Sequence, residues 1–312
     1  MEGKRPRIGV VGSSNVDLVT YVDRMPVWGE TIAAPRFEMS QGGKGANQAV
    51  AAAKLGADVV MVSKVGDDAL GDGVLQNFKG AGVGIGHVER VAGQSTGTAT
   101  ILVDEKSGDN CILIVKGANG DLQPADVERA GEDLGTCDLI LTQLEVPLET
   151  VYATLAFGRR RGVRTVLNPA PAVRDLDMER ARDANFLMPN ETELAILTRL
   201  PVESEAEVAA AADTLVRQGF EAVIVTLGAR GALVSTHEGA RRIAPVKVEA
   251  IDTTGAGDAF IGSFARYLAA GLSLDAALAQ ATRYAAFSVT RRGAQKSYAT
   301  EAEFEAFCAK LG

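Results

Sequence analysis

The residues best suited to chemistry lie at positions 252–258, Asp-Thr-Thr-Gly-Ala-Gly-Asp. The alternating segment 246–251 before them predicts a strand, and apolar residues at helical spacing after them predict a helix ending at Gly271. Glycines let backbone N–H groups approach a ligand, and a helix start favours an anion. Asp258 would repel a bound phosphate unless it accepts a proton, although it could also only complement the helix dipole. The stretch therefore predicts either an anion site with a base or an ordinary helix start.

The elements that would position this stretch alternate regularly in the second half of the chain. Strands are expected at residues 138–142, 163–167, 185–188 and 222–226, with helices at 151–162 and 208–219. This alternation predicts an α/β fold with a parallel sheet covered by helices on both faces. Ligands of such sheets bind beyond the carboxyl ends of the strands. The candidates at those ends are Glu145, Asn168, Asn190, Thr226 and Gly228.

Two other segments, 17–41 and 96–117, do not follow this alternation. The first mixes short β patterns with a turn near Pro26, and the second predicts a hairpin with a glycine-containing turn. We expect the two segments to form one small β-sheet lid. It would lie over a main domain made of residues 1–16, 42–95 and 118–312.

Six motifs in this chain resemble those of the ribokinase-like (PfkB) carbohydrate kinases. Residues 252–258 match one family signature, and residues 42–49, Gly-Gly-Lys-Gly-Ala-Asn-Gln-Ala, match the other. Shorter motifs follow the family's order at Asn15-x-Asp17 and at residues 168–171, 190–193 and 226–231. The resemblance implies a three-layer α/β/α sandwich with a mostly parallel sheet, plus a small β-sheet lid. Because the family's lid commonly pairs with that of a second subunit, we expect a homodimer through the lid.

The resemblance also implies which residues carry phosphoryl transfer. The family's catalytic base corresponds to Asp258, and the amides that bind the transferred phosphoryl group correspond to Gly255, Ala256 and Gly257. The sugar would be held by Asn15, Asp17, Gly43, Lys44, Asn47, Glu145 and Asp258. Simpler alternatives stay open: Asn15 and Asp17 could form an Asx turn, Lys44 could be a surface lysine, and Glu145 could be a helix-terminal acid.

Nucleotide and metal positions are carried over from the family in the same way. ATP would contact Asn190, Thr226, Gly228, Ala229, Gly231, Gly257 and Thr282, although Asn190 could also cap the following helix. Glu193 corresponds to a family acid that meets Mg²⁺ through water, and Mg²⁺ usually keeps several waters. Potassium would be held by oxygens of Asp252, Thr254, Ser288, Arg291, Gly293 and Ser297. The chain departs from the family at Thr282-Arg283-Tyr284, where small residues with Asn or His usually lie near the adenine.

The implied reaction is ATP-dependent phosphorylation of a pentose at O5. We expect D-ribose, giving ribose 5-phosphate, because Asn15 buried beside a missing 2-hydroxyl would lack a partner at a cost of about 1–3 kcal/mol. The alternative is 2-deoxyribose, because residues 143–152, 176–178 and 285–290 are similar to the deoxyribokinase branch of the family. A non-catalytic sugar-binding regulator ranks lower, because Asp258 and the Gly-Ala-Gly turn are intact. A nucleotide-cofactor oxidoreductase ranks last, because residues 12–14 lack the G-x-G-x-x-G spacing.

Composition argues against several other classes of protein. The 312 residues carry a net charge of −8 with a pI near 5.0, which disfavours nucleic-acid and anionic-membrane surfaces. Cys111, Cys137 and Cys308 are scattered and odd in number, so they predict neither a disulfide framework nor a zinc site. No apolar run reaches the ~18 residues of a membrane helix. We therefore expect a cytoplasmic protein whose partners are ATP and a pentose.

Overall fold

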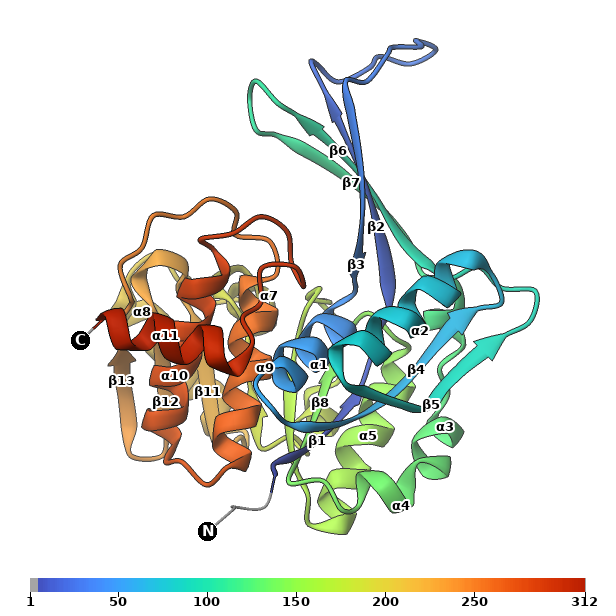
Figure 1. The fold of residues 1–312 in the computed structure, drawn as a ribbon. Coiled ribbons are helices and arrows are strands. Elements are labelled where there is room, and N and C mark those ends of the chain that lie inside the picture. Colours follow the sequence, from blue (N-terminus) through green and yellow to red (C-terminus); the bar gives the residue numbers. More distant parts are fainter. Residues whose placement is uncertain (1–4, 312) are drawn as a thin grey trace.

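The computed structural model describes residues 5–311 and contains two sheets of different size (Figure 1). The strands of the large sheet follow the order β13-β12-β11-β10-β9-β8-β1-β4-β5. They are β1 (Arg7–Val11), β4 (Asp58–Gly66), β5 (Val83–Val91), β8 (Leu139–Gln143), β9 (Arg164–Asn168), β10 (Phe186–Leu187), β11 (Ala222–Thr226), β12 (Ala232–Thr236) and β13 (Gly239–Ile243). Neighbouring strands are parallel from β5 to β11, and the β11–β12 and β12–β13 pairs are antiparallel.

Helices cover both faces of this sheet and bury an apolar cluster on each. One face packs against α1 (Lys44–Lys54), α2 (Ala69–Ala81), α9 (Ala256–Ala269), α10 (Leu274–Ser288) and α11 (Glu301–Leu311). The other packs against α3 (Pro124–Arg129), α4 (Gly131–Leu134), α5 (Leu148–Arg161), α6 (Met178–Ala181), α7 (Glu191–Thr198) and α8 (Glu205–Val216). The 3-10 turns are η1 (Gly117–Asp121) and η2 (Gly228–Arg230). Among the described residues, no helix has the length and apolar character to cross a membrane.

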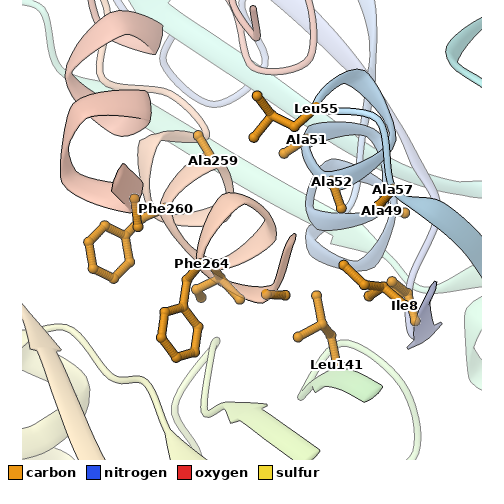
Figure 2. Packing of buried hydrophobic residues seen from close by; sticks show 14 of the residues in the cluster. Ile8, Ala49, Ala51, Ala52, Leu55, Ala57, Leu141, Ala259, Phe260 and Phe264 are labelled. Atoms are coloured by element: carbon orange, nitrogen blue, oxygen red, sulfur yellow. The ribbon is translucent and has the colours of Figure 1, made fainter. Parts of the chain in front are cut away.

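Helices α1 and α9 pack side by side (Figure 2). This contact brings the two signature motifs together, because Asn47 and Gln48 reach Asp258. The inner side of α1 is a run of alanines that includes Ala51 and Ala52, both fully buried. On α9, an added Cβ at Gly262 would lie 2.5 Å from the backbone oxygen of Gln48. Small residues on both helices therefore let the first turn of α1 reach the first turn of α9.

The small sheet projects away from the sandwich in Figure 1. Its strands are β2 (Asn15–Val22), β3 (Arg36–Gly42), β6 (Gly97–Asp104) and β7 (Asn110–Val115), in the order β3-β2-β6-β7. The central β2–β6 pair is parallel, and both outer pairs are antiparallel. The three-layer α/β/α fold with a mostly parallel large sheet and a separate small sheet, expected from the sequence, is confirmed.

The prediction of a strand at 246–251 is wrong. The segment between β13 and the signature stretch has no strand structure. It lines a cavity through Val246, Lys247, Val248 and Ala250, and the backbone N–H of Ile251 donates to the carbonyl of Val289. An alternating pattern also suits an extended segment with one side on a cavity and the other in solvent, so alternation alone could not separate the two cases.

Candidate active site

The first turn of α9 carries the residues predicted to be catalytic. Gly255 caps the helix with φ at 73°, and an added Cβ would lie 2.7 Å from Tyr298 Oη, so only glycine fits there. Gly257 lies in the first turn, where backbone N–H groups have no intrahelical acceptor. The N–H of Ala256 donates to the carbonyl of Thr253 at 3.2 Å. An anion at this turn would meet backbone amides of the first turn and the positive end of the helix dipole.

Asp258 is held in this turn by two amide side chains. Its exposed fraction is 7%, its Oδ2 accepts from Asn47 Nδ2 at 2.9 Å, and its Oδ1 accepts from Gln48 Nε2 at 3.0 Å. Burial raises the pKa of Asp258, while Lys44 and the two amides act in the opposite direction. A buried carboxylate with a raised pKa, fixed at the edge of a cavity, is suited to accept a proton.

The residues predicted to bind the sugar come from three elements that converge near Asp258. They are Asn15 and Asp17 on β2, Gly43, Lys44 and Asn47 at the start of α1, and Glu145 after β8. Glu145 joins two of these segments, because its Oε2 accepts from the backbone N–H of Lys44 at 2.9 Å and from Ser13 Oγ at 2.5 Å. The Asp17 carboxylate lies against Gly42, where any Cβ would overlap it. The structure therefore assembles this set, while its contacts with a sugar stay predictions.

Lys44 and the acids Asp17, Glu145, Glu193 and Asp258 form what we call the carboxylate cluster. Burial, and then the charges of Glu145 and Asp258, raise the pKa of Asp17 to about 6. Burial acts to lower the pKa of Lys44, but the charges of Asp258, Glu145 and Glu193 hold it above its ordinary value. Lys44 is therefore a cation among one buried and three partly buried acids, and is positioned to interact with an anionic ligand.

Two cavities adjoin at the start of α9. The Asp258 cavity has a volume of about 210 Å³, and its wall includes Lys44, Asn168, Asn190, Glu193, Gly255 and Asp258. The Thr282 cavity has a volume of about 530 Å³, and its wall includes Phe260, Thr282, Ala285, Ala286 and Val289. Both are lined by Thr226, Thr253, Ala256 and Gly257. A ligand that fills the Thr282 cavity can therefore extend an anionic end toward Asp258.

Most residues predicted to bind the nucleotide line the larger cavity. Those in the wall of the Thr282 cavity are Thr226, Gly228, Ala229, Gly231, Gly257 and Thr282. Asn190 lines the Asp258 cavity instead and caps α7, since its Oδ1 accepts from the backbone N–H of Glu193 at 2.8 Å. In return, the Glu193 carboxylate accepts from the backbone N–H of Asn190 at 2.8 Å. The capping alternative for Asn190 is confirmed, and its contact with ATP stays a prediction.

The departure at Thr282-Arg283-Tyr284 leaves the cavity wall intact. Of these three residues, only Thr282 lines the Thr282 cavity. Tyr284 is fully buried on the other side of α10, where its hydroxyl donates to the carbonyl of Ala299 at 2.8 Å. Its ring packs edge-on against Phe304. The large side chain at position 284 is therefore part of the core and does not narrow the cavity.

The acids at the site suit a metal that arrives with a nucleotide. Glu193 lines the Asp258 cavity, and burial raises its pKa. Within residues 5–311, no group of three or more His, Cys, Asp or Glu side chains is arranged to hold a metal ion. Since Mg²⁺ is usually bound by one or two carboxylates, waters and substrate phosphates, this arrangement fits it without a dedicated protein cage.

The predicted potassium residues lie on two adjoining segments joined at Asp252. Its Oδ1 accepts from Thr254 Oγ1 at 2.6 Å, and its Oδ2 accepts from the backbone N–H of Gly293 at 2.8 Å. The others are Ser288 and Ser297, which are buried, and Arg291, whose guanidinium forms an ion pair with Glu303. Oxygen atoms of this kind suit a monovalent cation, and Arg291 could contribute only its carbonyl oxygen.

Sequence reasoning missed an amide network behind Asp258. Gln48 and Asn47 both donate to Asp258, and Gln143, Asn168 and Gln295 donate to or accept from these two amides. Gln48 lies inside the second signature motif, and Asn168 opens another. However, adjacent helical residues do not normally share a face, so nothing in the spacing predicts that positions 47 and 48 meet one carboxylate.

Comparison with known proteins agrees with this geometry. The sequence profile of the pfkB family carbohydrate kinases matches residues 5–301. The chain is 49% identical to the deoxyribokinase of Salmonella typhimurium (strain LT2), covering 96% of this chain and 98% of that protein. It is 42% identical to the ribokinase of Bacillus subtilis (strain 168), with the same coverage of both. The Arabidopsis thaliana ribokinase complexed with ribose and ATP superposes with a TM-score of 0.91 at 30% identity, covering 97% of this chain and 98% of that one.

The chain belongs to the pfkB family of carbohydrate kinases, as the motifs predicted. It is an ATP-dependent sugar kinase, and kinases of this family use a divalent metal such as Mg²⁺ with the nucleotide.

Proposed function

We propose that this kinase phosphorylates 2-deoxyribose at O5, rather than the ribose expected from the residue pattern. The observation that carries this choice is the higher identity to a deoxyribokinase, 49% against 42% for the ribokinase of Bacillus subtilis. The contacts of Asn15 weaken the main argument for ribose. Its Oδ1 already accepts from Asn119 Nδ2 at 2.7 Å, so this oxygen does not need a sugar 2-hydroxyl as a partner.

Ribose is the second candidate, because the same site offers polar groups to an additional hydroxyl. Asp17 is an acceptor with a partly exposed carboxylate, and Asn15 carries an amide NH₂ beside it. Proteins named ribokinase also match nearly the whole chain. A pocket that tolerates the 2-hydroxyl would turn over both pentoses with similar efficiency.

In the proposed reaction, Asp258 takes the proton from the 5-hydroxyl as that oxygen attacks the γ-phosphate of ATP. The amides of Gly255, Ala256 and Gly257, together with Lys44, stabilise the charge on the transferred group. Mg²⁺ bound with ATP would neutralise phosphate charge, and Glu193, which lines the Asp258 cavity, would meet it through water. Asn15, Asp17, Gly43, Asn47 and Glu145 would hold the sugar beside Asp258.

The test compares initial rates of phosphorylation of 2-deoxyribose and of ribose with Mg-ATP. Both sugars are assayed over the same series of concentrations. The kcat/KM for 2-deoxyribose is expected to be at least about tenfold higher, which corresponds to about 1.4 kcal/mol of transition-state binding. A higher value for ribose would overturn the substrate proposal. If neither sugar is phosphorylated but both bind by calorimetry, the chain acts as a sugar-binding regulator.

We also propose that potassium binds at Asp252, Thr254, Ser288, Arg291, Gly293 and Ser297 and orders the turn before α9. The hydrogen bond between Asp252 and Gly293 supports this, because it ties the two ligand segments together beside that turn. Replacing K⁺ by tetramethylammonium, which cannot enter an oxygen cage, is expected to lower kcat. Equal rates in both salts would remove the cation from the mechanism.

We further propose that residues 17–41 and 96–117 act as a lid that pairs with the lid of a second copy. Every residue of β7 is exposed, including Ile112 and Ile114, and Phe37 and Met39 are exposed on β3 at the other edge. Apolar residues on an uncovered sheet favour association. Light scattering should give a dimer for the parent and a monomer for Ile114→Asp, whereas a monomeric parent would contradict the proposal.

A further inference from the structure

Both oxygens of the Asp258 carboxylate are occupied by amide donors from adjacent residues of α1. Asn47 Nδ2 donates to Oδ2 at 2.9 Å, and Gln48 Nε2 donates to Oδ1 at 3.0 Å. Gln48 is fully buried, and it lines neither the Asp258 cavity nor the Thr282 cavity. Gln48 therefore acts on Asp258 from behind, on the side away from the ligand.

The partners of Gln48 determine which way round its amide lies. Gln143 Nε2 donates to Gln48 Oε1 at 2.7 Å, and Gln48 Nε2 also donates to Asn168 Oδ1 at 3.2 Å. Asn168 is in turn oriented by a backbone carbonyl, because its Nδ2 donates to the oxygen of Met188 at 2.9 Å. A carbonyl can only accept, so this chain of bonds requires Gln48 to present its NH₂ group to Asp258.

The amide network of Gln48, Gln143 and Asn168 does not pair all of its own buried polar atoms, so the pairing of polar groups does not explain its presence. Gln143 is fully buried, and its Oε1 has no hydrogen-bond partner among the described residues. An apolar residue at position 143 would avoid that unpaired oxygen, because an unpaired buried carbonyl is destabilising. What the glutamine adds is the single donor that orients Gln48.

We propose that Gln48, oriented by Gln143 and Asn168, is a positioning residue that holds the Asp258 carboxylate in the direction and in the anionic form that proton abstraction requires. The inference rests on the proposed role of Asp258 as the base. A carboxylate that receives two N–H donors stays ionised more readily than one that is only buried, since hydrogen bonds to the charged form favour that form.

Other charged or titratable groups also act on Asp258. They are Lys44 from α1, Asp17 from β2, Glu145 after β8, Glu193 from α7 and Tyr298 from the segment before α11. Only Lys44 among them favours the anion. The three acids disfavour it, so the amide donors oppose both burial and the neighbouring carboxylates.

The experiment compares the parent with Gln48→Met, which removes the donor and keeps a similar volume, and with Gln143→Met, which removes only the orienting donor. Asn185→Leu is the control, because it removes an amide at the opposite ends of the strands, beside Thr165 and Glu221. Carboxyl-¹³C NMR of each protein without substrate gives the Asp258 titration, assigned through Asp258→Asn. The acid limb of kcat/KM against pH gives the same titration during turnover.

Gln48→Met is expected to move both titrations upward by roughly one pH unit, Gln143→Met to move them less in the same direction, and Asn185→Leu to leave them in place. An unchanged Asp258 titration in both methionine variants would show that these amides do not hold the carboxylate in its anionic form and would overturn the proposal. If Gln48→Met does not fold, the titration of Gln143→Met decides. Because the NMR titration needs no substrate, a parent that phosphorylates neither pentose would contradict the proposed function without deciding the role of Gln48.

Discussion

The Thr282 cavity and the carboxylate cluster lie side by side but are built from different kinds of groups. The cavity wall consists mostly of glycine, alanine, valine and threonine, with backbone exposed at Gly228 and Gly231. The cluster holds four acids around one lysine, and burial raises the pKa of Asp17, Glu193 and Asp258. A large ligand with its own charged phosphates needs space and amides, whereas a small neutral sugar must be oriented by hydrogen bonds to charged groups. Binding in the Thr282 cavity therefore depends mainly on the shape of the cavity, whereas binding at the carboxylate cluster depends on the ionisation of its acids.

The largest expected effect comes from removing the ionisable group at the junction of the two regions. Asp258→Asn should lower kcat by roughly 10²–10⁴-fold, because the base is lost while the size and shape of the side chain are kept. Calorimetric sugar binding should change little. Asp213→Asn on α8, which lines neither cavity, is the control. An unchanged kcat for Asp258→Asn would show that the cluster does not supply the base.

Filling the Thr282 cavity should raise the KM for ATP and leave the KM for the sugar unchanged. Ala286→Phe places a ring in the wall, and since overpacking costs typically 1–3 kcal/mol, the KM for ATP should rise by about tenfold or more. Ala276→Phe adds the same ring at an exposed position of α10 and should leave both KM values unchanged. An equal rise in the sugar KM for Ala286→Phe would break the division between the two regions.

Lowering the pH should weaken sugar binding before it weakens nucleotide binding. The pKa of Asp17 is raised to about 6, so as pH falls from 7 to 5 most of this acid becomes protonated and no longer offers a charged acceptor. The sugar KM should therefore rise by up to about tenfold over this range, while the KM for ATP changes less. Steady-state kinetics across pH measures both constants.

The dependence of thermal stability on pH gives an independent check on the pKa of Asp17. An acid with a raised pKa destabilises the fold above that pKa, because the unfolded state ionises more easily. Asp17→Asn should thus raise the Tm at pH 7 by about a few degrees and have little effect near pH 3, below the pKa of the unfolded acid. A pH-independent sugar KM in the parent would show that Asp17 does not accept from the sugar.

The smallest effect is expected at the departure from the family motif. Arg283 lies next to Thr282 in sequence but does not line the cavity. Arg283→Ala should therefore change the KM for ATP by less than about twofold. A larger change would mean that this arginine reaches the nucleotide and that the cavity is not defined by small residues alone.

Much of the fold could be predicted from local patterns. The strands predicted at 138–142 and 222–226 appear as β8 (Leu139–Gln143) and β11 (Ala222–Thr226), because continuous apolar runs between polar turns are typical of buried parallel strands. Alternation at 246–251 misled, since the segment lines a cavity and pairs with no strand. Periodicity reports which side chains are covered, but it does not say what covers them.

The sequence by itself determined the family, the α/β class and the identity of the groups that could act, because these depend on residue types at fixed spacing. Asp258, Lys44 and the Gly-Ala-Gly turn are recognisable from their motifs alone. Only the tertiary structure decided that Gln48 and Asn47 meet the two oxygens of Asp258, and that Asn15 is already paired with Asn119. These contacts join residues 104 to 211 positions apart. The two contacts of Asp258 exist because Gly262 and the alanines of α1 let two helices approach closely. Spacing along a chain carries no information about such a contact.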